Sequence, residues 1–307
     1  MRLLNSAAIA ASLTLITAAA THAQLSLVSL EQHNRQTNVS ITSPVGFSFY
    51  ATAEEFDGEI TATVSANAGF LASNGAQGLP NQGDFLEYEV SYPTGADLLA
   101  DFPLSATYTI ATSGAVTDTA VIAGRSGGFL DWRPATPVFT LTGVSGTWTI
   151  ENGQGVFTFD PTGVTSFTIT TNGYSATTLG GHYGAYMSVA EINNGFHQIG
   201  EIGVGPEPDA TPYSAPVFTF TNGLAANSDE DDTTYGFTSG TLLELEAGFF
   251  NVIGYDAVLG QAFVVGNTTS FLLRAQASAI PEPATYAQIF GAVAAVAGLI
   301  YRRRKQR

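Results

Sequence analysis

The 307-residue chain contains no cysteine. Disulfide bonds, thiol catalysis and thiolate metal sites are therefore excluded, and the fold must be stabilised by packing and by backbone hydrogen bonds. Charged residues make up only 12% of the sequence, about half the usual share. Surface helices normally carry many charged side chains, so this scarcity favours strands and turns.

Lysine is absent from the segment between Gln24 and Ala279, which we call the body. The body contains four arginines and 25 acidic residues, which gives it a formal charge of −21. A surface this acidic repels phosphate backbones, so we expect no nucleic-acid partner. The acidity instead suits an exported protein, or one that meets divalent cations.

The body also lacks any sustained 3.6-residue apolar period. Parallel α/β folds need crossover helices of about ten or more residues, so such folds are disfavoured. We expect only two short helices, over Gly95 to Asp101 and over Val189 to Asn194.

The pattern that dominates the body is alternation of apolar and polar residues, with many β-branched and aromatic side chains. Clean examples are Glu59 to Val64, Thr107 to Ile110, Thr147 to Ile150 and Val156 to Phe159. Each of them predicts a half-buried antiparallel strand. The fold class that follows is all-β: an antiparallel β-sandwich or jelly-roll-like body with one large lobe or two small ones.

Asn-Gly pairs predict turns between these strands, because both residues tolerate the positive φ of a type I′ turn. They occur at Asn152-Gly153, Asn172-Gly173 and Asn222-Gly223. The interval from Val138 to Thr178 therefore predicts a meander of about four or five strands.

Prolines mark two candidate places for a subdivision of the body, near residue 134 and over residues 206–216. The segment from Pro137 to Gly143 is echoed by the segment from Pro216 to Asn222. Duplication is one explanation of the echo, and convergence of short strands is the other.

The first 23 residues have the three parts of a secretory signal peptide. Arg2 supplies the basic start, residues 7–20 are apolar, and Thr21-His22-Ala23 places small residues where a signal peptidase cuts. We expect cleavage between Ala23 and Gln24. An uncleaved anchor is disfavoured because the apolar run is shorter than a membrane span of about 20 residues.

The other end of the chain carries an 18-residue stretch without charge, from Ala284 to Tyr301. A helix of that length extends about 27 Å, enough for a single transmembrane helix. A basic cluster follows at once, and we expect it to stay in the cytoplasm with the body outside. Its members are Arg302, Arg303, Arg304, Lys305 and Arg307.

Pro281-Glu282-Pro283 lies directly before this apolar span. The order of the parts, over residues 280–307, resembles the PEP-CTERM sorting signal that exosortases process in Gram-negative bacteria. The resemblance implies retention in the inner membrane, recognition of the Pro-Glu-Pro motif by an exosortase, and transfer to the cell surface or to an extracellular matrix that contains exopolysaccharide. The alternative is a single-pass anchor that is never processed. The resemblance implies nothing about the activity of the body.

Catalytic motifs are weak in the body. Gly124-Arg125-Ser126-Gly127-Gly128 has the spacing of a nucleophile elbow, but Phe129 to Pro134 do not predict the helix that an elbow requires. His33, His182 and His197 show no metal-ligand spacing, and the last two lie in glycine-rich stretches that predict loops. We therefore expect no catalytic residues.

Two acidic clusters are candidates for a calcium site. Asp229, Glu230, Asp231 and Asp232 are consecutive, and the stretch from Glu54 to Glu59 carries four more carboxylates. Ca²⁺ prefers six to eight oxygen ligands, which closely spaced carboxylates and loop carbonyls supply. Neither cluster has the EF-hand frame. The other interpretation is a solvated loop that keeps the protein soluble, with no cofactor.

Two glutamate pairs open a second interpretation of the body. Glu87 with Glu89, and Glu244 with Glu246, would each lie about 7 Å apart on one face of a strand, and we expect these positions to face solvent. A cleft that held them beside exposed aromatic side chains would indicate a secreted jelly roll that binds or cleaves carbohydrate. The candidate aromatic residues are Trp132, Trp148, Tyr183 and Tyr186, of which Trp148 alternates like a core residue. The first hypothesis is an exported, non-catalytic surface or matrix protein.

Overall fold

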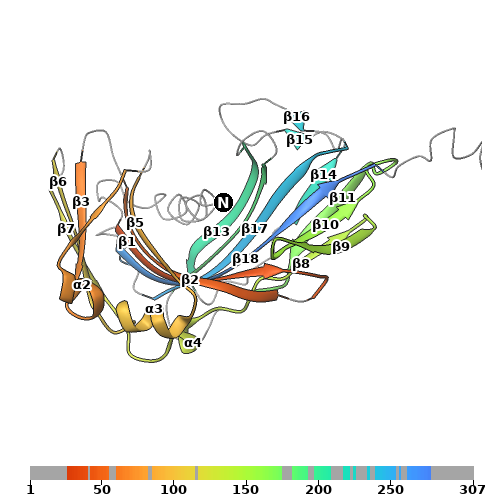
Figure 1. The fold of residues 1–307 in the computed structure, drawn as a ribbon. Coiled ribbons are helices and arrows are strands. Elements are labelled where there is room, and N and C mark those ends of the chain that lie inside the picture. Colours follow the sequence, from red (N-terminus) through yellow and green to blue (C-terminus); the bar gives the residue numbers. More distant parts are fainter. Residues whose placement is uncertain are drawn as a thin grey trace, which may run out of the picture.

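The computed structural model describes residues 26–40, 42–54, 60–81, 85–114, 117–174, 182–192, 197–208, 217–221, 224–225, 234–235, 239–253, 256 and 261–277. The expected cleavage site at Ala23 and Gln24, the Pro-Glu-Pro motif, the apolar span, the basic cluster and the acidic cluster at 229–232 lie outside these residues. Within the described residues the protein is an all-β fold built mainly from antiparallel sheets, as the alternation predicts (Figure 1).

Strands account for most of the described chain. They are β1 (Ser26–Gln36), β2 (Thr42–Glu54), β3 (Ile60–Ala66), β4 (Gln77–Leu79), β5 (Phe85–Tyr92), β6 (Thr107–Gly114), β7 (Thr119–Ala123), β8 (Phe139–Thr142), β9 (Gly146–Glu151), β10 (Gln154–Phe159), β11 (Ser166–Thr171), β12 (His182–Glu191), β13 (His197–Pro208), β14 (Val217–Thr221), β15 (Leu224–Ala225), β16 (Thr234–Tyr235), β17 (Leu242–Val252) and β18 (Gln261–Ala275). The helices in these ranges are short: α2 (Gly69–Asn74), α3 (Gly95–Asp101) and α4 (Phe129–Trp132).

The largest sheet has nine strands and is strongly curved (Figure 1). Its continuous path runs β13-β12-β17-β18-β1-β2-β5, and the hairpin of β9 and β10 joins it at β18. The long strand β18 pairs in parallel with β1 along Gln261 to Ser270, and in parallel with β10 along Leu272 to Ala275. The sequence does not predict these parallel pairings, because alternation reports which face is buried and not the direction of the partner strand.

Alternation along the strands gives this sheet two different faces. The convex face packs against two smaller sheets, β4-β3-β6-β7 at one end and β14-β11-β8 at the other. The opposite, concave face carries charged and polar side chains together with a row of aromatic ones. One large sheet therefore serves two separate cores in a sandwich-like arrangement.

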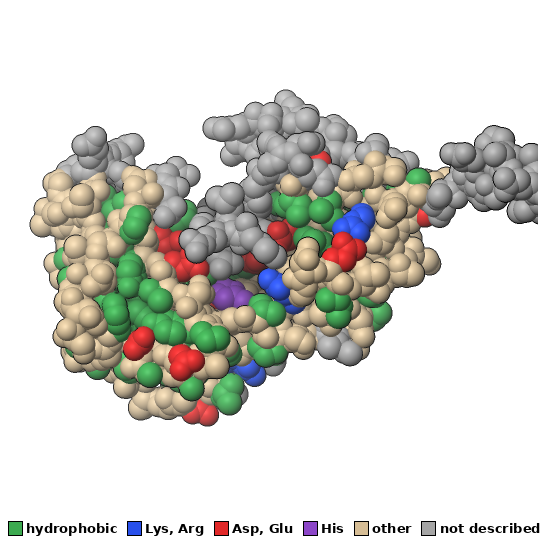
Figure 2. Space-filling view, viewed as in Figure 1, with side chains coloured by type: hydrophobic (Ala, Val, Ile, Leu, Met, Phe, Trp, Pro, Cys, Tyr) green, Lys and Arg blue, Asp and Glu red, His purple; other side chains and the backbone are tan. Residues whose placement is uncertain are grey.

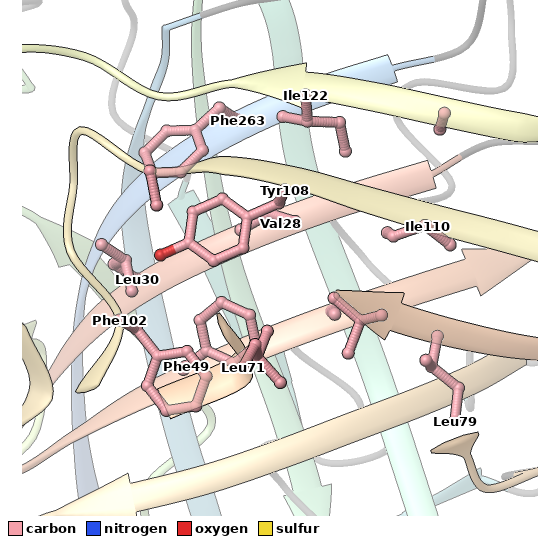
Figure 3. Close-up of a cluster of buried hydrophobic side chains, with 14 of the residues drawn as sticks. Val28, Leu30, Phe49, Leu71, Leu79, Phe102, Tyr108, Ile110, Ile122 and Phe263 are labelled. Atoms are coloured by element: carbon pink, nitrogen blue, oxygen red, sulfur yellow. The ribbon is translucent and has the colours of Figure 1, made fainter. Parts of the chain in front are cut away.

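The first core lies between the convex face and the sheet β4-β3-β6-β7 (Figure 3). Phe49 of β2 stacks on Phe102 with ring centroids 3.9 Å apart, and Tyr108 of β6 contacts both Phe49 and Phe263. The short helices α2 and α3 add the buried side chains of Leu71 and Leu98. Full burial of one such side chain contributes about 1.5–3 kcal/mol, so helices this short are stabilised by the core and not by their own length.

The second core lies between the convex face and the sheet β14-β11-β8. Phe167 of β11 stacks on Phe220 of β14 with centroids 4.8 Å apart. Trp148 of β9 packs on Phe157 and Phe271, as its alternation predicts. The two cores share no residue, so each end of the large sheet is stabilised by its own cluster.

The segment that follows α4 crosses between the two cores and is fixed by buried amide side chains. Asn267 donates to the carbonyl oxygen of Pro134 over 3.0 Å and accepts from Asn34 over 2.6 Å. Gln36 donates to the carbonyl of Phe139 over 2.9 Å and accepts from its amide over 2.7 Å. A buried polar group left without a partner costs about 1–3 kcal/mol, so these contacts hold the crossing segment in one register.

Two of the helix predictions are corrected and one is confirmed. The helix expected over Gly95 to Asp101 is α3, and Thr94 caps its N-terminus. The helix expected over Val189 to Asn194 is wrong, because Val189 to Glu191 complete β12, which hydrogen-bonds to β13 and β17. Tertiary pairing outweighs the weak local pattern there. The residues from Phe129 to Trp132 form one helical turn, α4, although the sequence predicts no helix.

The turn at Asn152-Gly153 is confirmed: it joins β9 to β10 with φ values of 51° and 76°. Asn172-Gly173 is not a hairpin turn, because the side chain of Asn172 accepts from the amide of Val138 and β11 pairs with β8 and β14. The predicted meander is wrong for the same reason, since β9 and β10 belong to the large sheet. Asn222-Gly223 lies outside the described residues.

The two segments with similar sequences become β8 and β14. They flank β11 on opposite sides, and both run antiparallel to it. Each contributes a fully buried phenylalanine, Phe139 and Phe220, to the second core. The two phenylalanines occupy different positions of the similar segments, the third in the first segment and the fifth in the second.

Candidate functional site

The concave face of the large sheet concentrates carboxyl groups from three strands. Glu31 lies on β1, Glu87 and Glu89 lie on β5, and Glu244 and Glu246 lie on β17. Figure 2 shows acidic side chains together with basic ones and a histidine in a hollow of the molecule. Glu31, Glu87 and Glu246 are only 2%, 4% and 6% exposed.

The expectation that the two glutamate pairs face solvent is therefore wrong for Glu87 and Glu246. The sheet curves, and its concave side encloses the middle of β17 as well as β1. A sequence signal for this burial exists, because the run from Ala247 to Phe250 is apolar without alternation. Such runs are typical of strands that are buried on both faces. Glu31 has no comparable signal, since a run of polar residues follows it in β1.

Burial raises the pKa of Glu31 and of Glu246 to about 8, and the pKa of Glu87 and of Glu244 to about 7. Neighbouring charges add to this effect: Glu87 and Glu89 raise the pKa of Glu31, and Glu244 raises that of Glu246. Near neutral pH Glu31 and Glu246 therefore retain their protons, and Glu87 and Glu244 are protonated in part. A protonated carboxyl group both donates and accepts hydrogen bonds.

Hydrogen bonds hold two of these acids and leave a third open. The hydroxyl of Ser29 donates to Glu31 over 2.7 Å, and the hydroxyl of Tyr186 donates to Glu246. Oε2 of Glu87 is buried and has no hydrogen-bond partner in the described part of the chain. Such an atom costs about 1–3 kcal/mol.

His33 follows Glu31 on the same face of β1. Its Nδ1 lies 2.9 Å from the hydroxyl oxygen of Thr268, and its Nε2 lies 3.4 Å from that of Tyr50. Burial lowers the pKa of His33 to about 4. The ring is therefore neutral at physiological pH, with one nitrogen that donates and one that accepts.

Two glycines on the concave face make room for aromatic rings. A Cβ at Gly248 would lie 2.3 Å from Cε1 of Tyr186, and a Cβ at Gly266 would lie 2.7 Å from the ring of Phe250. The rings of Tyr186 and Phe250 stack with centroids 5.6 Å apart. Both rings therefore lie over the glycines, close to the backbone, and leave the hollow open.

A pocket of about 420 Å³ opens beside the acids, within the usual range for small-ligand sites. Its wall combines the carboxyl groups of Glu244 and Glu246 with the guanidinium of Arg35. The remaining lining residues supply hydroxyl, amide, imidazole and apolar groups: His33, Asn34, Val45, Gly46, Phe47, Ser48, Ser91, Tyr92, Pro93, Gln154, Thr268 and Ser270. A wall of this composition suits an uncharged ligand with many hydroxyl groups.

The two histidines that the sequence places in loops lie on strands, so that expectation is wrong. In the ladder of β12 and β13, His182 is opposite Pro208 and His197 is opposite Glu191. They therefore lie at opposite ends of the ladder and form no pair. No group of three histidine or acidic side chains in the described residues is arranged to hold a metal ion.

The remaining candidates from the sequence, Tyr183, Tyr186, Ser126 and Trp132, do not belong to the pocket wall. Tyr183 and Tyr186 are 2% and 1% exposed, which corrects their assignment as exposed aromatics. Ser126 lies in a loop after β7, as expected, and its carbonyl accepts from the indole of Trp132 over 3.1 Å. None of these side chains lines the pocket. No helix in the described ranges has the length and apolar character to span a membrane.

Comparison with known proteins gives no family. No family model matches the sequence, and no curated protein matches it. Among solved structures, red sea bream transglutaminase is similar over 83% of this chain at 9% identity with a TM-score of 0.22, and this chain spans 32% of its length. A DUF3823 family protein from Bacteroides ovatus is similar over 77% of this chain and 98% of its own length, at 10% identity and a TM-score of 0.19. The BSP domain of a biofilm associated protein is similar over 82% of this chain and 30% of its own length, at 14% identity and a TM-score of 0.17. Scores this low carry no functional argument.

Proposed function

We propose that this chain is an exported, non-catalytic surface or matrix protein of a Gram-negative bacterium, sorted by an exosortase through its C-terminal tail. The observation that carries the proposal is the order of Pro281-Glu282-Pro283, the uncharged span 284–301 and the terminal basic cluster. The span inserts as a transmembrane helix, and the basic residues stay in the cytoplasm. The exosortase then recognises the Pro-Glu-Pro motif and releases the body to the cell surface or the matrix.

For the body, the function that the geometry supports best is binding of a polyhydroxylated ligand, such as a segment of exopolysaccharide, in the concave pocket. Protonated Glu244 and Glu246 act as donors and acceptors for sugar hydroxyls, and Arg35 adds further donors.

Cleavage of the ligand is disfavoured by the electrostatics of the pocket. A glycosidase needs two carboxyl groups whose pKa values are pushed apart, so that one is an acid while the other is ionised. Burial raises the pKa of Glu244 and of Glu246 together, to about 7 and about 8. At neutral pH Glu246 holds its proton and Glu244 is protonated in part, so neither group is the fully ionised carboxylate that a nucleophile requires.

Sorting is tested by replacing Pro281, Glu282 and Pro283 together with alanine in the native host. The unchanged chain is expected in the surface or matrix fraction, and the variant is expected to remain in the inner membrane. Identical fractionation of the two chains would remove the support for exosortase processing and favour the unprocessed anchor.

Binding is tested with exopolysaccharide purified from the host, by calorimetry on the full chain in detergent. Arg35→Ala should weaken binding at least about tenfold, because a lost charge-assisted hydrogen bond costs roughly 1.5–3 kcal/mol. Glu191→Gln, on β12 outside the pocket lining, is the matched control and should bind like the unchanged chain. Equal affinities for both variants would refute binding at this pocket.

A further inference from the structure

The hairpin strand β9 forms an edge of the large sheet. Among the described residues it pairs with β10 alone, in an uninterrupted register from Gly146 to Glu151. The sequence predicts a half-buried strand, but every residue of β9 except Trp148 is exposed, and Ile150 is 65% exposed. Natural edge strands are usually protected from other chains by lysine, proline or a bulge. The strand β9 has none of these.

The hairpin geometry determines which backbone groups of β9 are free. Residues that flank a two-residue turn form a hydrogen-bonded pair, and such pairs alternate along the ladder. The amides and carbonyls that point toward β10 therefore belong to Thr147, Thr149 and Glu151. Those that point to the free edge belong to Gly146, Trp148 and Ile150.

An apolar pocket of about 260 Å³ adjoins the same edge. It is lined by Val39, Phe139, Leu141, Val144, Ser145, Gly146, Trp148 and Phe157. Gly146 leaves one end of the strand without a side chain. Ile150, at the other end, lies on the same face of β9 and projects into solvent. The edge therefore carries a hole at one end and an aliphatic side chain at the other.

We propose that β9 pairs with β9 of a second copy of this chain, antiparallel about a two-fold axis at Trp148. In this register Gly146 of each copy faces Ile150 of the other, and the free backbone groups of both strands meet as partners. Each Ile150 side chain then covers the apolar pocket beside the opposing Gly146. The contact is isologous, so it closes as a dimer and does not extend into a filament.

The charge distribution permits a second copy at this edge. The body carries a formal charge of −21, so most approaches of two copies are repulsive. Residues 134–174 contain only two charged residues, Glu151 and Asp160. Arg274 neutralises Glu151 through two hydrogen bonds of 2.7 Å. Repulsion between copies is therefore weak along β9.

The size of the contact sets the strength that we expect. Pairing through a six-residue strand buries less than the roughly 1,600 Å² of a standard stable interface. A dissociation constant in the micromolar range follows, and local crowding of copies at a surface would favour the dimer. Sedimentation of the full chain in detergent should show monomer and dimer in a concentration-dependent ratio. Monomer alone up to about 100 µM would overturn the proposal.

The absence of cysteine allows a direct test of the register by cross-linking the full chain. Thr147 of one copy faces Thr149 of the other as a non-hydrogen-bonded pair, whose Cβ spacing suits a disulfide. Oxidation of the double variant Thr147→Cys with Thr149→Cys should give a covalent dimer on a non-reducing gel. Each single variant should give much less covalent dimer, because the cysteine of one copy does not face the cysteine of the other copy in this register.

A charged substitution provides the matched control. Ile150→Lys in the double-cysteine background should remove the dimer, since it places two ammonium groups over apolar pockets. Val121→Lys makes the same change at another edge strand, β7, where Val121 is 56% exposed, and should leave the dimer unchanged. A dimer that survives Ile150→Lys, a ladder of larger species, or the absence of a dimer from a chain with unchanged circular dichroism would each overturn the proposal.

Discussion

The hydroxyl of Tyr186 donates a hydrogen bond to the carboxyl group of Glu246 across the neighbouring strands β12 and β17. Both residues are buried in the concave face. Burial raises the pKa of Glu246, and the hydrogen bond from Tyr186 acts in the opposite direction. The hydrogen bond from Tyr186 therefore keeps the pKa of Glu246 lower than burial alone would set it.

Replacement of Tyr186 by phenylalanine keeps the ring and removes the donor. We expect the free energy of unfolding to fall by about 1–3 kcal/mol, because Glu246 loses its buried partner. Denaturant titration measures the change. In a Glu246→Met background the same substitution should cost much less. An equal cost in both backgrounds would show that the hydrogen bond contributes nothing.

Stability should fall as pH rises from about 5 to about 9. Glu31 and Glu246 have folded pKa values of about 8 against an ordinary value of 4.5. Their contribution is therefore complete below pH 4.5 and is lost as pH rises through 8, on the order of 3 to 5 kcal/mol for each group. The folded pKa of His33, about 4, has the opposite effect and lowers stability as pH falls from 6.5 to 4.

Melting temperatures in a series of buffers measure this dependence. The two effects together place the maximum near pH 4–5, because above pH 4.5 the two carboxyl groups lose more stability than the one imidazole gains. Replacing both Glu31 and Glu246 with glutamine should flatten the decline on the alkaline side. A melting temperature that climbs steadily between pH 5 and 9 would contradict the burial of these acids.

Gly248→Ala should displace the aromatic rings of the concave face. The new Cβ would lie 2.3 Å from Tyr186 and 2.7 Å from Phe250, both of them buried rings. We expect a loss of about 1–3 kcal/mol from overpacking, measured by chemical denaturation. Gly78→Ala is the control, because a Cβ at Gly78 of β4 meets nothing within 4 Å. Similar losses for the two variants would mean that the close approach at Gly248 is unimportant.

Local signals in the sequence predict where strands lie better than they predict which strands pair. Alternation of apolar and polar residues locates β3, β6, β9 and β10. The Asn-Gly pattern correctly locates the hairpin turn at Asn152-Gly153. These features depend on a few adjacent residues. The parallel pairing of β1 with β18 joins opposite ends of the body, and no local pattern encodes it. The same limit explains the wrong meander, in which consecutive strands separate into two sheets.

The candidate site is predictable only in part for the same reason. The sequence singles out Glu87, Glu89, Glu244 and Glu246, but not their burial, which depends on the curvature of a nine-stranded sheet. Glu31 and His33 join the site because β1 lies between β2 and β18. That position is a property of the assembled sheet and leaves no local mark on β1.

The central claim is that both ends of the chain direct the body out of the cell. The intact mass of the mature protein, isolated from its own host, tests this claim most directly because it reports both cuts together. We expect a mass that lacks residues 1–23 and lacks the tail beyond the region of Pro281-Glu282-Pro283. A mass of 32.0 kDa, which corresponds to all 307 residues, would contradict it.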